Sequence, residues 1–149
     1  MTRAAYGKNL AGTFRAETQS TFVSSVRGET FALTRLRRTQ PIVERTVPLR
    51  PEAAFHFGYQ LVDRGNVELW TGNRLVPRGP FLADTLSMMD IALEPSSRAD
   101  GPQDALLFYL PRSVLDELSR ERGGGTVTEL RVPPGVSVVD PVVRHLGLS

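Results

Sequence analysis

Alternating apolar and polar positions predict several short β-strands along the chain. The alternation is clearest in residues 55–61, where a glycine and polar residues occupy one face and the other face carries Phe55, Phe57, Tyr59 and Leu61. Residues 105–110 form a continuous apolar run that is short enough for a buried strand. Further strands are expected at residues 21–26, 31–37, 42–47, 81–83 and 88–93.

Glycine, proline and asparagine mark turns between these strands. Gly65-Asn66 fits a two-residue hairpin turn, and in that register Leu61 lies opposite Trp70. Trp70 would then join the aromatic face of the preceding strand. Gly72-Asn73 predicts the next turn, and the Pro/Gly-rich residues 77–80 predict a corner through which no helix could continue.

Beyond residue 93 the sequence predicts a loop and then a helix after the apolar strand. Residues 94–104 are rich in Pro, Ser, Asp and Gly and indicate a surface loop. Pro111 suits the start of a helix, because its ring fixes a helical φ. That helix would end at Gly123-Gly124-Gly125. Its apolar face would carry Val114, Leu115 and Leu118.

We expect one domain with an arm and a tail. Residues 1–19 have weak periodicity and are interpreted as an extended or partly ordered N-terminal arm. Residues 20–122 would form the β-domain and its helix, and residues 123–149 a linker and the start of a second helix. Asp140-Pro141 begins that second helix as an N-cap and first-turn proline. We interpret the short helix as part of a longer natural protein; the alternative is a C-terminal helix docked on the barrel.

Composition and charge fit a globular protein. The 149 residues are enough for a core, 40% are hydrophobic, and a net charge of +2 does not indicate a dedicated DNA-binding domain. The absence of cysteine excludes a disulfide framework and a thiol nucleophile. The sequence has no apolar run as long as a signal peptide or a membrane span, so a cytoplasmic location is expected.

The order of these pieces resembles a known family. Val43-Glu44-Arg45-Thr46 precedes the alternating strand, a small turn holds Gly72 and Arg74, and the corner Pro77-Arg78-Gly79 leads into residues 81–85. The barrel would close with residues 106–112. Over roughly residues 31–118, the chain resembles the N-terminal sensor domain of AraC/XylS-type transcription regulators. The resemblance implies an all-β, cupin-like antiparallel barrel or jelly roll with one or two short C-terminal helices.

Two departures from the family pattern stand out. Pro80 occupies the place where the family corner has an acidic residue, and these residues contain no helix-turn-helix module. The resemblance implies a small-molecule pocket on the strands around the long loop. Its expected members are Arg50, Tyr59, Trp70, Asp90, Leu106 and Phe108. The aromatic face of residues 55–61 has two interpretations, namely ordinary barrel core and part of this pocket.

The sequence gives no pattern for metal or covalent chemistry. His56 and His145 lie far apart and form no H-x-H pair, so we expect no metal, no cofactor and no catalytic residue. A basic stretch is interpreted as a solvated sheet face, with an anion or acidic-partner site as the alternative. Its members are Arg35, Arg37, Arg38, Arg45 and Arg50.

The resemblance implies an effector-sensing and dimerisation domain of an AraC/XylS-type regulator rather than an enzyme. Its partners would be an unknown small molecule and a second copy of the chain, which would contact the apolar helix face at Val114, Leu115 and Leu118. DNA would be bound only through a C-terminal module that this chain lacks, and no membrane contact is expected. The alternatives are a cupin-type small-molecule enzyme and a stand-alone, non-catalytic interaction protein with a solid barrel core.

Overall fold

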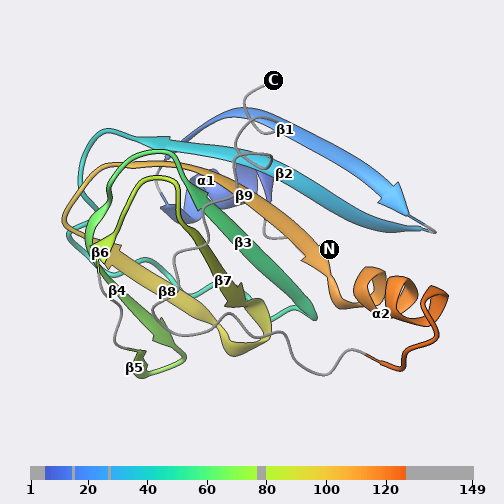
Figure 1. The fold of residues 1–149 in the computed structure, drawn as a ribbon. Helices are drawn as coiled ribbons and strands as arrows, with labels where there is room; N and C mark the ends of the chain where they lie inside the picture. The colour runs from blue at the N-terminus through green and yellow to red at the C-terminus, as the bar shows by residue number, and fades with distance from the viewer. Residues whose placement is uncertain (1–5, 15, 27, 77–79, 127–149) are drawn as a thin grey trace.

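The computed structural model of the chain describes residues 6–14, 16–26, 28–76 and 80–126. Within these ranges it contains nine strands in two antiparallel sheets, two α-helices and one short 3-10 helix (Figure 1). The fold is therefore all-β, as the sequence predicts. The predicted second helix at residue 141 and most of the predicted tail, including His145, lie outside the described residues.

The larger sheet has the strand order β1-β2-β9-β3-β7. Its strands are β1 (Glu17–Val26), β2 (Glu29–Arg38), β3 (Ala54–Gln60), β7 (Leu86–Asp90) and β9 (Gln103–Pro111). The predicted apolar strand, β9, is the central strand of this sheet, which explains why apolar residues continue along both of its faces. The strands predicted at residues 21–26, 31–37 and 55–61 are confirmed as parts of β1, β2 and β3.

The smaller sheet is built around β4 (Gly65–Thr71). Strand β8 (Pro95–Ala99) lies along one edge of β4, and β5 (Arg74–Val76) and β6 (Pro80–Phe81) lie along the other. The predicted Gly72-Asn73 turn is confirmed, because Thr71 pairs with Arg74. Gly72 has a φ of +59°, a conformation that glycine adopts without strain.

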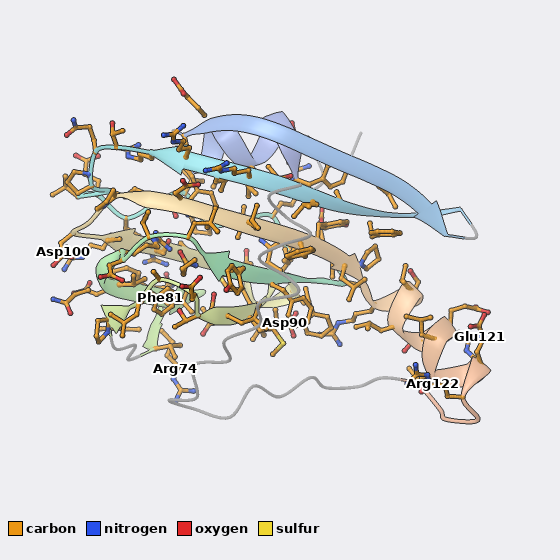
Figure 2. All side chains as sticks on the ribbon, turned by 45° about the horizontal axis from the view of Figure 1, so that its top comes forward. Arg74, Phe81, Asp90, Asp100, Glu121 and Arg122 are labelled. Carbon is orange, nitrogen blue, oxygen red and sulfur yellow. The ribbon has the colours of Figure 1, made fainter. Side chains whose placement is uncertain are left out.

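The predicted hairpin at Gly65-Asn66 is wrong. Strand β3 pairs with β7 and β9, whereas β4 belongs to the other sheet, so residues 61–64 connect two sheets. Gly65 is required for a different reason: its φ is +71°, and a Cβ atom there would lie 2.1 Å from Oδ1 of Asp100. Asp100, labelled in Figure 2, accepts a hydrogen bond from the Asn66 N–H at 2.7 Å.

The predicted surface loop at residues 94–104 is also wrong, because β8 forms there. Pro95 occupies the first position of the strand, where a proline is tolerated. Ser97 is buried, and its N–H donates to the Thr46 hydroxyl at 3.1 Å while its carbonyl accepts from the Thr46 N–H at 2.9 Å. Polar residues therefore form a buried strand here because their hydrogen-bonding groups find partners.

The segment that supplies Thr46 was itself predicted as a strand at residues 42–47. It has only an isolated bridge between Ile42 and Ala99. Val43 and Val47 are exposed, so its β-branched residues do not pack on a pleated surface. Of the other predicted strands, residues 88–93 divide into the end of β7 and a 3-10 helix, Ile91–Leu93, and residues 81–83 contribute only Phe81 to β6.

The N-terminal arm, which the sequence predicts to be extended or partly ordered, contains helix α1 (Gly7–Phe14). Leu10 and Phe14 lie four residues apart on one helix face, and both are buried. The Gly7 N–H donates to Oγ1 of Thr34 at 2.9 Å and ties the helix to β2. The hydrophobic core around them consists of Leu10, Phe14, Leu36, Ile42, Leu49, Ala54, Ile91, Ala105 and Leu107.

Helix α2 (Arg112–Glu121) follows β9 directly and projects from the end of the larger sheet (Figure 1). The predicted helix is confirmed, and Gly123 follows it with a φ of +79°, as expected of a glycine after a helix. The three residues of its predicted apolar face differ in exposure. Val114 is buried, Leu115 is half-buried and Leu118 is 49% exposed.

Candidate functional site

A cavity lies between the two sheets. The centre of a water-sized molecule has about 30 Å³ of free space in it. The larger sheet contributes both polar and apolar residues to the cavity, among them Met88 and Met89 of β7, and β4 contributes apolar ones. Phe14 of α1 and Phe81 of β6 also line the space; Phe81 is labelled in Figure 2. The strand residues in the lining include His56, Gly58 and Gln60 of β3, Val67 and Leu69 of β4, and Gln103 and Leu107 of β9.

Gly58 lines the cavity without adding a side chain to it. A Cβ atom at this position would lie 3.0 Å from Oγ of Ser87 and 3.2 Å from Cδ2 of Leu107, closer than side chains normally pack. On the same face of β3, His56 and Gln60 flank the glycine and are buried. The inner face of this strand is therefore small and polar, not aromatic.

The most unusual side chain at the cavity is Arg64, in the connection between β3 and β4. Its backbone N–H donates to the Phe81 carbonyl at 2.8 Å, which fixes the connection against β6. The residue is only 5% exposed, and its Nε and Nη2 atoms have no hydrogen-bond partner. Burial lowers the pKa of Arg64 to about 10, so the guanidinium still carries its charge at neutral pH.

The residues around Arg64 do not neutralise it. Among the described residues that line the cavity, Arg64 is the sole lysine or arginine, and none is an aspartate or glutamate. Gln60 and Gln103 are buried nearby in the same lining, and the Oε1 atom of each has no hydrogen-bond partner. Leaving a buried polar group unpaired costs about 1–3 kcal/mol. Several such groups around one cavity indicate a place prepared for a polar occupant.

Four of the residues expected in the pocket lie on the opposite face of the larger sheet. Tyr59 and Leu106 are paired neighbours there, each 0% exposed, and the Tyr59 hydroxyl donates to Oδ1 of Asp84 at 3.0 Å. Phe108 and Asp90 belong to the same face. None of the four lines the cavity. The polar side of β3 lines the cavity, whereas Phe55 and Tyr59 on the aromatic side are buried away from it. Of the two interpretations of the aromatic face, burial favours core over pocket.

Trp70 lies away from Tyr59, contrary to the predicted register. It pairs with Leu75 and Ser96 on the smaller sheet and is half-buried. The guanidinium carbon of Arg45 lies 4.8 Å from its ring centroid, and that of Arg98 lies 5.9 Å away. Trp70 thus packs beneath cations on the outer face of β4. Arg50 is exposed, in the segment before β3, and is not part of the cavity lining.

The basic stretch from Arg35 to Arg50 does not form one anion site. Arg35 makes two hydrogen bonds with Asp104, at 2.8 and 2.9 Å, and this carboxylate raises the pKa of Arg35. Arg38 donates to backbone carbonyls, including that of Phe14 at 3.2 Å. Arg45 donates to Oγ of Ser96 at 2.7 Å. Arg35, Arg38 and Arg45 instead have different structural partners, and Arg37 shares Asp104 with Arg35 at 4.0 Å.

A metal site needs several ligating side chains close together within the described ranges. No group of three or more His, Asp or Glu residues gathers there in a way that could hold a metal ion. No helix in the described part of the chain is both long enough and apolar enough to span a membrane.

Sequence reasoning did not single out Arg64, Gln60 and Gln103 as site residues. Arg64 precedes Gly65-Asn66 and resembles an ordinary solvated turn residue. Gln60 and Gln103 lie near the ends of β3 and β9, where glutamine is common at strand boundaries. The one available signal was the polar side of β3, where two large polar residues alternate with a glycine inside a strongly apolar strand.

Comparisons with protein-family models, with curated proteins and with solved structures give no match for this chain.

Proposed function

We propose that the chain is a ligand-sensing domain with a cupin-like barrel, of the type found at the N-terminus of AraC/XylS regulators. The observation that carries the proposal is the cavity between the sheets, which is lined by buried polar groups without partners. Such a lining favours a binding domain over a stand-alone interaction protein with a solid core. The ordered sequence features that resemble the sensor family supply the second part of the proposal.

Helix α1 gives this cavity a connection to the rest of the molecule. Phe14 lines the cavity, and its carbonyl accepts from Arg38 on β2. At the other end of the helix, Gly7 bonds to Thr34, also on β2. A ligand that fits the cavity better with α1 in one position would shift the population of helix positions. In a regulator, that shift would be passed to a dimer and then to a DNA-binding module outside these residues.

Binding in the cavity can be tested with a filled variant. Ser87 lines the cavity from β7, so Ser87→Met should occupy the space. Ser113 is exposed on α2, and Ser113→Met is the matched control. A thermal-melt screen of small metabolites should find compounds that stabilise the wild type and Ser113→Met but not Ser87→Met. If no compound distinguishes the wild type from Ser87→Met, the cavity is not a binding site and the proposal fails.

A sensing role requires a second readout. A compound that binds should also change the sedimentation of the chain or the exchange of α1 backbone amides with solvent, since a sensor must change its conformation or assembly. Binding with no change in either measurement would leave a binding protein without a sensing mechanism and would contradict this part of the proposal.

A further inference from the structure

We propose that the cavity binds a small carboxylate with an adjacent hydroxyl group, and that Nε and Nη2 of Arg64 hold the carboxylate. This inference rests on the proposed binding function and names the chemistry of the ligand. Nε and Nη2 lie on one edge of the guanidinium plane, and they are the two Arg64 atoms buried without partners. Two parallel N–H donors on one edge match the two oxygens of a carboxylate.

The charge of the site favours a ligand with a single negative charge. One buried cation contributes to the cavity lining, and no described lining residue carries a carboxylate to balance it. The remaining wall is largely apolar, with Val67, Leu69 and Leu107 among its members. An ion pair is stronger in such surroundings than in water. A monoanion would neutralise Arg64, whereas a neutral ligand would leave the buried charge without a partner.

The two glutamines indicate the second group of the ligand. Gln60 and Gln103 each present an Oε1 atom that lacks a donor. A carboxylate cannot supply that donor, because an ionised carboxylate only accepts hydrogen bonds. A hydroxyl group on the same molecule can, and it adds no second positive charge beside Arg64. The complementary ligand therefore carries acceptors for Arg64 and a donor for the glutamine oxygens.

The size of the cavity limits the rest of the ligand. About 30 Å³ of such space corresponds to roughly two or three water-sized positions. This allows a compact molecule with few non-hydrogen atoms and excludes a sugar or an aromatic acid unless Phe14 or Phe81 moves. Glycolate is the simplest chemical probe with both required groups. Acetate lacks the donor, and acetamide lacks the charge.

The test uses NMR spectra of arginine side chains together with thermal melts. Glycolate should shift the Nε–H signal of Arg64 and raise the melting temperature of the wild type, and acetamide and sodium chloride should do neither. Arg64→Met should weaken glycolate binding by about 10- to 100-fold, the range expected for hydrogen bonds to a charged group. Arg74 is exposed on β5, so Arg74→Met is the matched control and should bind like the wild type.

Gln60→Leu tests the second group of the ligand. It should weaken glycolate binding about fivefold or more, as expected for one lost hydrogen bond, and should leave acetate binding nearly unchanged. If glycolate leaves the Arg64 signal unmoved, or if Arg64→Met binds it as tightly as the wild type, the carboxylate assignment is wrong. Neutral compounds that bind the wild type but not Ser87→Met would then preserve the proposed function. If no compound of either kind distinguishes those two proteins, both proposals fail.

Discussion

Arg112 donates a hydrogen bond from Nη2 to Oδ2 of Asp90 at 2.5 Å and thereby joins the first residue of α2 to the end of β7. The guanidinium carbon of Arg112 also lies 4.7 Å from the ring centroid of Phe55. Asp90 was expected to contact a ligand, but here it serves as a structural anchor that also accepts from the Ala92 N–H at 3.0 Å. The position of α2 relative to the larger sheet therefore depends on an ion pair and an aromatic contact.

This anchor predicts a stability loss for Arg112→Met. The two side chains are 27% and 22% exposed, so the pair is stronger than a surface ion pair but weaker than a buried one. We expect the free energy of unfolding to fall by about 1–2 kcal/mol. Urea unfolding measures this, with Arg120→Met on the exposed face of α2 as the control. A double-mutant cycle with Asp90→Asn that shows no coupling would contradict the assigned contact.

Arg64→Met should have the opposite effect on the ligand-free protein. It replaces a buried cation whose Nε and Nη2 atoms lack partners by an unbranched apolar side chain, which removes a desolvation cost. The free energy of unfolding should rise by about 1–3 kcal/mol. Chemical unfolding in buffer free of carboxylates gives the measurement, and Arg74→Met should change it little. A clear loss of stability would show that Arg64 has a structural partner and is not kept for a ligand.

Two aromatic residues should respond differently to truncation. Tyr59 is 0% exposed, so Tyr59→Ala should cost about 3–5 kcal/mol, as buried aromatics do. Trp70 is half-buried on the outer face of β4, and its contacts with Arg45 and Arg98 are worth about 0.5–1 kcal/mol each. Trp70→Ala should therefore cost about 1–2 kcal/mol. Equal losses for the two variants would favour the hairpin register rejected above.

Strand β3 shows what an alternating sequence pattern can predict and what it cannot. Alternation in residues 55–61 located β3, which spans Ala54–Gln60, to within one residue, because the period of two survives in any half-buried strand. It could not tell which side faces the interior, since Phe55 and Tyr59 on one side and His56 and Gln60 on the other are all buried. The outer side is buried by distant residues, among them Arg112 and Asp84, and no local pattern encodes such coverage.

The candidate site was harder to predict than the fold. The isolation of Arg64 depends on the absence of carboxylates from the described residues that line the cavity, many of which lie far from Arg64 in sequence. It also depends on Phe81, whose carbonyl accepts from the Arg64 N–H. Strand β8 was missed for a related reason. Its serines are typical of a loop when only the sequence is considered. In the structure, Thr46 and Arg45 provide hydrogen-bond partners for them. Polar residues that are buried with partners, or prepared for a ligand, look like surface residues in a single sequence.

The last prediction concerns self-association through α2. Of the three residues expected at the interface, Val114 packs within its own chain, and Leu118 is 49% exposed at the other end of the apolar stripe. A second copy of the chain could cover the exposed end through a two-fold arrangement, in which each stripe contacts its symmetry mate. Leu118→Glu should then shift sedimentation toward the monomer and leave the β spectrum unchanged, because an unpaired carboxylate is costly to bury.

Two further variants make this experiment decisive. Val114→Glu should unfold the domain, because its side chain is only 5% exposed and lies within the monomer. Ser113→Glu adds the same charge at an exposed position of α2 and should leave sedimentation as in the wild type. If Leu118→Glu and Ser113→Glu sediment alike, the helix face is not a contact between copies. Assembly, if the wild type shows any, must then use another surface, and the signal from the cavity cannot pass through α2.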